Sequence, residues 1–99
     1  MLVIIGTFEL APEDREAFLR SRGDAMRRSR GEKGCHLYTF GADPLEPGRV
    51  YVTERWESEE DLANHLAAAR SAPATEPTVP VISMEFMKYE VTAGRPLDV

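Results

Sequence analysis

Two strand patterns followed at once by a capped helix pattern, over residues 34–66, constrain the fold of this chain more than any other feature. Residues 35–40 and 49–57 show the alternation and the aromatic and β-branched content of strands. The segment 41–48 between them contains two prolines and two glycines, which interrupt strand pairing and favour a turn. These residues predict a β-hairpin that leads directly into a helix.

The helix after the hairpin has a strong start signal. Ser58 is a suitable N-cap, and the next three residues are acidic, which stabilises the positive end of a helix dipole. The pattern predicts a helix to about Arg70, with one face made of Leu62, His65, Leu66 and Ala69. A histidine on a face that meets a sheet is either a packed core residue or part of a pocket.

The N-terminal third of the chain predicts one strand and one helix. The run Leu2–Leu10 is strand-like, and a proline and acidic residues follow it where a helix would begin. Helical spacing continues from Glu13 to about Arg30, and Gly31 is the expected stop.

The C-terminal third predicts a loop and a last strand. Three prolines over residues 71–80 are incompatible with an ordinary helix, whereas residues 81–91 return to a strand pattern. We therefore expect residues 1–91 to form a single domain and residues 92–99 to form a polar tail.

The resulting order βαββαβ is that of a ferredoxin-like α+β fold, a four-stranded antiparallel sheet with two helices on one face. The strand segments 2–5 and 81–87 place apolar side chains on both faces of that sheet. A second copy of the chain is the simplest cover for the face without helices, so we expect a homodimer.

Composition excludes several classes of partner. The net charge of −5 provides no basic surface for a nucleic acid. No apolar run is long enough to span a bilayer, and the N-terminus lacks the features of a signal peptide. The single cysteine, Cys35, cannot form an internal disulfide, which is typical of a cytoplasmic protein.

The residues of the hairpin and the following helix also resemble a known family. The matching positions are Gly34, Cys35, Tyr38, Glu54, Trp56, Ser58, Glu60, Leu62, His65 and Leu66, and they are similar to those of the antibiotic biosynthesis monooxygenase family. The resemblance implies a dimeric α+β barrel with a pocket between sheet and helices in each subunit. It also implies cofactor-free oxidation of anthrones or quinols by molecular oxygen, in polyketide or quinone metabolism.

Haem-degrading relatives belong to the same superfamily. The resemblance implies that those members use an asparagine on the first strand, a tryptophan in the helix after the third strand and a later histidine. Here the first strand has Gly6 and Thr7, the helix position is His65, and no histidine follows. Haem degradation is therefore the less favoured alternative.

His65 is the candidate catalytic residue. An imidazole that titrates near neutral pH can accept a phenolic proton or stabilise a phenolate, although a core histidine bonded to a carbonyl explains the pattern as well. Trp56, Tyr38 and His36 are candidate substrate-binding residues. Trp56 is equally consistent with core packing, and Tyr38 and His36, expected on one strand face, with packing at a dimer seam.

Glu54 and Arg22 complete the set of candidate site residues. Glu54 is expected on the same strand face as Trp56, and a buried carboxylate needs a partner. Arg22 interrupts the apolar stripe of the first helix, so it can be that partner or extend to solvent. An ion pair of structural importance is as consistent with these residues as a role in substrate binding.

No cofactor and no metal are expected. The chain has two histidines, and no ligand pair occurs at the spacings typical of metal sites. A glycine-rich phosphate loop is absent as well. The sequence thus predicts a monooxygenase whose partners are a small aromatic substrate and molecular oxygen, or else a non-catalytic ligand-binding or stress-response dimer of the same fold.

Overall fold

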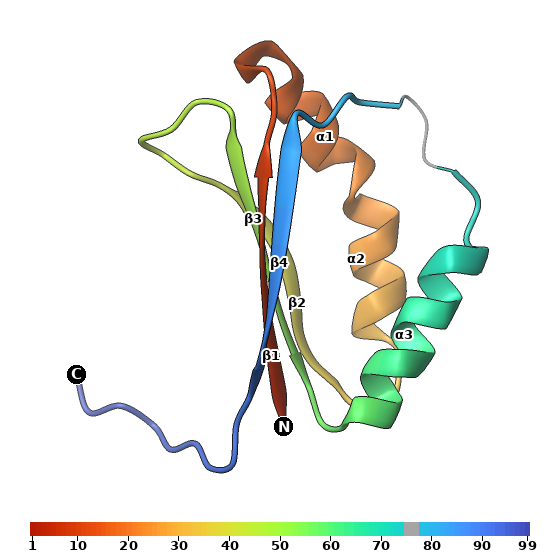
Figure 1. Cartoon of the computed structure of the whole chain (residues 1–99), viewed down its shortest axis with the longest axis vertical. Helices are drawn as coiled ribbons and strands as arrows, with labels where there is room; N and C mark the ends of the chain where they lie inside the picture. Colours follow the sequence, from red (N-terminus) through yellow and green to blue (C-terminus); the bar gives the residue numbers. More distant parts are fainter. Residues whose placement is uncertain (75–77) are drawn as a thin grey trace.

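A four-stranded antiparallel sheet with its helices on one face forms this protein (Figure 1). The structure is a computed structural model that describes residues 1–74 and 78–99. The strands are β1 (Leu2–Glu9), β2 (Cys35–Ala42), β3 (Arg49–Trp56) and β4 (Ser83–Glu90), in the order β2-β3-β1-β4. The predicted ferredoxin-like α+β fold is confirmed.

The first helical region is two helices, so the prediction of one helix from Glu13 to Arg30 is wrong. A short 3-10 turn, Pro12–Asp14, precedes α1 (Arg15–Ser21), and α2 (Gly23–Arg30) follows after a break at Arg22. At the break the Arg22 N–H donates to the Leu19 carbonyl at 3.1 Å, a tighter turn than that of an α-helix. The Gly23 that follows has a low helix propensity, which makes this a favourable place for the break.

The helix after the hairpin, α3 (Glu59–Ser71), starts as predicted. The Ser58 hydroxyl accepts a hydrogen bond from the Asp61 backbone N–H at 3.1 Å. Its buried face is made of Asp61, Leu62 and His65, whereas Leu66 is 43% exposed and Ala69 is exposed, so the predicted face is only half right. The helix diverges from the sheet toward its C-terminus, and only its first turns are packed (Figure 1).

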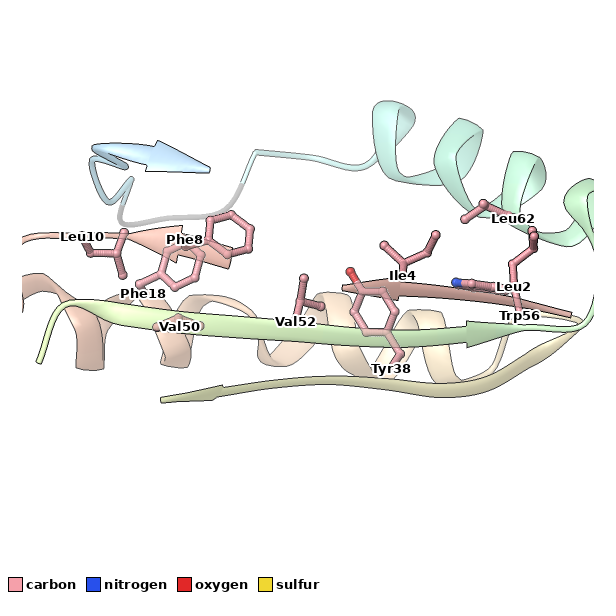
Figure 2. Packing of buried hydrophobic residues seen from close by; sticks show 10 residues of the cluster. All are labelled: Leu2, Ile4, Phe8, Leu10, Phe18, Tyr38, Val50, Val52, Trp56 and Leu62. Carbon is pink, nitrogen blue, oxygen red and sulfur yellow. The ribbon is translucent and has the colours of Figure 1, made fainter. Parts of the chain in front are cut away.

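The hydrophobic core lies between the sheet and the helices (Figure 2). Every second residue of β1 and β3 points into it, as expected for strands with one covered face. The core side chains are Leu2, Ile4, Phe8, Leu10, Phe18, Tyr38, Val50, Val52, Trp56 and Leu62.

The opposite face of the sheet is also apolar, as predicted. The strand register places on it the partly exposed side chains of Val3, Ile5, Leu37, Tyr51, Met87 and Tyr89. The tail after β4 extends on the same side, away from the helices (Figure 1). A hollow of about 740 Å³ between the tail and this face is lined in part by Met1, Val3 and Arg55.

Gly6 on β1 allows an aromatic ring to lie against the sheet. A Cβ atom at this position would be 2.6 Å from Val52 Cγ1 and 2.7 Å from Phe86 Cε2, closer than carbon atoms pack. Phe86 therefore occupies space that any other residue at position 6 would need. Its ring also makes an edge contact with Phe8, with the centroids 5.5 Å apart.

Gly34, directly before β2, is a second position where the backbone lies close to a neighbouring side chain, here that of Asp61. Its φ is +80°, a conformation that glycine adopts without strain. The carboxylate of the buried Asp61 occupies the space where a Cβ of residue 34 would lie. The Gly34 carbonyl also accepts a hydrogen bond from the Glu57 N–H at 2.8 Å, so this glycine joins the start of β2 to the end of β3 and to α3.

The loop predicted over residues 71–80 is only partly described. Ser71 is the last residue of α3, and the described positions 72–74 and 78–80 contain no helix or strand. Residues 75–77 lie outside the described part of the chain.

Candidate functional site

His65 lies at the centre of a buried cluster of polar and aromatic side chains. Its ring is on the first turns of α3 and is 5% exposed. The Nδ1 atom is 2.7 Å from Oε1 of Glu32, which belongs to the loop between α2 and β2. We call Glu32, Tyr38, Glu54, Trp56 and His65 the His65 cluster.

The hydrogen bond with Glu32 determines which nitrogen of His65 is basic. A carboxylate only accepts hydrogen bonds, so Nδ1 must carry a proton and donate it to Glu32. The other nitrogen, Nε2, is 3.9 Å from Oε1 of Glu54, which is too far for a hydrogen bond. In the neutral ring Nε2 therefore has a lone pair that no described residue engages.

Two aromatic rings pack against His65. The Trp56 ring centroid is 4.5 Å from that of His65, and the Tyr38 centroid is 5.3 Å away. Trp56 is fully buried, and its indole Nε1–H donates to Oε1 of Glu54 at 3.0 Å. The predicted site residues His65, Trp56, Tyr38 and Glu54 are thus neighbours in the structure.

Glu54 lies on the same strand face as Trp56, as predicted, and is buried. Burial raises the pKa of its carboxyl group, while the hydrogen bond from Trp56 and the proximity of His65 oppose this change. It accepts a hydrogen bond from the Trp56 indole and lies 3.9 Å from His65 Nε2. The alternative in which Arg22 neutralises Glu54 is wrong, because the Arg22 guanidinium contacts Ser21 and Phe18 instead.

Arg22 lies beside α1, at the break before α2. Its guanidinium is 5.4 Å from the centroid of the Phe18 ring, and its Nε donates to the Ser21 hydroxyl at 3.3 Å. Arg22 also lines a cavity of about 280 Å³ on the helix face of the sheet. The other residues lining this helix-face cavity are Phe8, Phe18, Ser21, Ala74, Thr78, Val79 and Val81.

His36 does not share a strand face with Tyr38, so that prediction is wrong. The pairing of β2 with β3 contains an irregularity between Cys35 and Leu37, and the extra residue shifts the alternation. The His36 side chain lies at the surface and pairs through Nε2 with the Glu57 carboxylate. It is not part of the His65 cluster.

A row of aromatic rings connects the helix-face cavity with His65. The row starts at Phe18 and continues through Phe8, Phe40 and Tyr38 to His65, with successive centroids between 5.0 and 5.9 Å apart. Burial raises the pKa of the Tyr38 hydroxyl, and the charge of Glu54 raises it further, whereas that of Arg22 lowers it. The charges of Arg22, at the cavity end of the row, and of Glu54, at the His65 end, thus both act on Tyr38.

The described residues close the His65 end of this row and leave the other end open. The His65 ring is 5% exposed, whereas the helix-face cavity borders α1 and does not include His65. Within these ranges no group of three or more His, Cys, Asp or Glu side chains is arranged to hold a metal ion.

Glu32 is the member of the cluster that sequence reasoning missed. It lies 33 positions before His65, in a loop between a helix and a strand, where no periodicity marks a buried side chain. The one sequence signal near it is Gly34, two positions later, where the chain turns and this loop meets α3.

Comparison with known sequences agrees with the resemblance in the hairpin and helix. The sequence model of the antibiotic biosynthesis monooxygenase family matches residues 1–74, about three quarters of the chain. No curated protein sequence matches significantly.

Solved structures share the fold at low sequence identity. A protein from Deinococcus radiodurans that carries the same family name superposes with a TM-score of 0.72 at 20% identity, covering 100% of this chain and 98% of that one. A Shewanella oneidensis protein gives 0.74 at 21% identity, over 89% and 87% of the two chains. The haem degrader MhuD from Mycobacterium tuberculosis, solved with two haems in its active site, gives 0.73 at 18% identity, over 97% and 100%.

Proposed function

Because the chain belongs to the antibiotic biosynthesis monooxygenase family, we propose that it is a monooxygenase for an electron-rich aromatic substrate. The substrate class is a phenol, anthrone or quinol, and the oxidant is molecular oxygen. Converting an anthrone methylene to a carbonyl consumes one oxygen molecule and releases one water molecule, so this reaction is balanced without a further reductant. The protein has to bind the ring, assist its ionisation and exclude water.

The observation that supports this proposal is the environment of the two His65 nitrogens. Glu32 holds the Nδ1 proton, and Nε2 has no hydrogen-bond partner among the described residues. A carboxylate that orients an imidazole in this way leaves the second nitrogen available as a general base. In the proposal, Nε2 accepts the substrate proton, and Trp56 and Tyr38 contact the aromatic ring.

Substrate contact requires movement at the His65 end of the aromatic row. His65 is 5% exposed, so a substrate hydroxyl reaches Nε2 only if α3 separates from the sheet. This helix is suited to such a movement, because its buried residues are confined to Asp61, Leu62 and His65. The helix-face cavity is the proposed entry point, since the row of rings begins there.

A second candidate function is ligand binding without turnover. The observation in its favour is that the cavity borders α1 and does not include His65. In that case the His65 cluster is a polar part of the core, and the helix-face cavity alone meets the ligand.

Oxygen uptake tests the proposed function. Protein freed of metal and flavin is incubated with a panel of anthrones, dihydroquinones and polyhydroxylated naphthalenes, and we expect oxygen consumption above that of buffer for at least one compound. Binding of the same panel is measured in parallel by calorimetry. Binding with uptake equal to buffer across the panel would favour the second candidate.

We also propose that the protein is a homodimer that buries the sheet face opposite the helices. That face presents Ile5, Met87 and Tyr89, each between 41% and 47% exposed in the single chain. The tail lies on the same side and leaves a hollow of about 740 Å³ in which a partner fits. The burial of this face would stabilise a domain of this size.

Light scattering tests the dimer with a matched pair of variants. We expect wild-type protein to have twice the chain mass at micromolar concentration, and Ile5→Glu to shift the equilibrium to monomer. Leu66→Glu is the control, because Leu66 is about as exposed but lies on the helix side. A monomeric wild type, or equal dissociation by both variants, would contradict the proposed interface.

A cytoplasmic location is part of the same proposal. Within the described ranges no helix is long and apolar enough to cross a membrane. Burial and the charges of Glu32 and Glu54 raise the pKa of the Cys35 thiol, which disfavours the reactive thiolate.

A further inference from the structure

The helix-face cavity combines an aromatic wall with an arginine that is not paired with any described carboxylate. From this combination we infer that the cavity binds an anionic aromatic ligand, with Arg22 receiving the acidic group. The inference deepens the proposed function by naming the charge of the ligand. Its test measures binding alone, so it succeeds or fails independently of turnover.

The wall of the cavity suits a flat ring. Phe8 and Phe18 both line it, with centroids 5.0 Å apart and ring planes inclined by 49°. Val79 and Val81 contribute aliphatic surface on the other side. The volume of about 280 Å³ is at the small end of ligand pockets, which favours one ring or two fused rings.

The polar side chains that line the cavity are Ser21, Arg22 and Thr78, and the charge of the arginine favours an anion. The Ser21 hydroxyl donates to the Phe18 carbonyl at 2.6 Å and accepts from Arg22 Nε at 3.3 Å, so it has no proton left to donate to a ligand. Neither Nη atom of Arg22 is hydrogen-bonded to a described residue, and no described carboxylate is within ion-pair distance. A guanidinium with its outer N–H groups available binds a carboxylate in two-pronged geometry.

The position of the guanidinium is fixed before a ligand arrives. Its hydrogen bond to Ser21 and its contact with the Phe18 ring, 5.4 Å from the centroid, hold it at the edge of the aromatic wall. A preorganised donor loses little side-chain freedom when it binds. The chain as a whole has a net charge of −5, so attraction of an anion has to be local to this site.

The test compares two probes that differ only in charge. Binding of 2-naphthoate and of 2-naphthamide is measured by calorimetry at neutral pH and low salt. We expect wild-type protein to bind the carboxylate about tenfold more tightly or better, as is typical of a charge-assisted hydrogen bond. Arg22→Gln should reduce naphthoate affinity to the level of naphthamide and leave naphthamide affinity unchanged.

Two further variants make the result specific to this cavity. Arg20→Gln is the matched control, because Arg20 is on α1, two positions before Arg22, but is exposed and paired with Glu16 at 3.0 Å, and it should keep the preference. Val79→Trp fills the cavity and should abolish the binding of both probes. If Arg22→Gln does not fold, Arg22→Lys replaces it and should retain a preference for the carboxylate.

Three outcomes would overturn the inference. They are equal affinity of wild type for the two probes, a preference that survives in Arg22→Gln, and unchanged binding in Val79→Trp. Oxygen uptake does not enter any of these comparisons.

Discussion

Replacing His65 with alanine should lower oxygen-dependent oxidation of the best panel substrate by roughly a hundred- to a thousandfold, as expected when a general base is lost. The fold should persist, because α3 keeps its Ser58 cap and its contact through Leu62. The measurement is kcat/KM from initial oxygen uptake, with circular dichroism to verify folding. Leu66→Ala on the same helix is the control, because Leu66 is 43% exposed and outside the His65 cluster.

The variant Glu32→Gln distinguishes two roles of His65, a general base acting through Nε2 and a ring that only packs in the core. A glutamine amide can donate to Nδ1 as well as accept from it, so it no longer fixes the proton on Nδ1. We expect kcat to fall and the pH profile of kcat/KM to shift, while the melting temperature changes little because Glu32 is partly exposed. Activity of His65→Ala equal to that of wild type would remove His65 from the reaction.

Replacing Gly34 with alanine should lower the free energy of unfolding by about 2 to 5 kcal/mol, which combines backbone strain with overpacking. The φ of +80° disfavours any side chain, and a Cβ would overlap the Asp61 carboxylate. The loss is a large part of the stability of a small domain, roughly 5 to 15 kcal/mol. Urea unfolding followed by tryptophan fluorescence measures it, because Trp56 is the only tryptophan and is fully buried.

Gly41→Ala is the matched control for this effect. Gly41 is in β2, the strand that begins directly after Gly34, and a Cβ there would meet nothing within 4 Å. We expect this variant to be unchanged or slightly more stable, because alanine restricts the unfolded chain. If both variants lost the same free energy of unfolding, the replacement of a glycine as such, and not the overlap with Asp61, would explain the effect.

The fold was predictable because its signals are local. Strand alternation in 35–40 and 49–57 and the Ser58 cap depend on neighbouring residues, and both appear in the structure. The break at Arg22 was not predicted, because helical spacing continues through it. The low helix propensity of Gly23 is the one sequence feature that favours a break there. The exposure of Leu66 depends on the angle between α3 and the sheet, which no periodicity encodes.

The candidate site was predictable only in part, for a related reason. The neighbourhood of Trp56 and Glu54 follows from strand alternation, and their proximity to His65 follows from the short connection between β3 and α3. The bulge that directs His36 to the surface is a property of pairing between strands, and Glu32 meets His65 only through tertiary structure. Such contacts are determined by packing between helices and strands, so the residue pattern of the sequence does not predict them.

The glycine at position 6 has a consequence for how related chains can diverge. The Phe86 ring rests where a Cβ of residue 6 would be, and the same ring touches Phe8, which lines the helix-face cavity. A relative with a larger residue at position 6 should therefore have smaller residues at positions 52 and 86, so these positions are expected to covary with position 6. Phe86 on β4 lines no part of the cavity but contacts Phe8, which does, so a substitution at position 86 should alter the cavity wall indirectly.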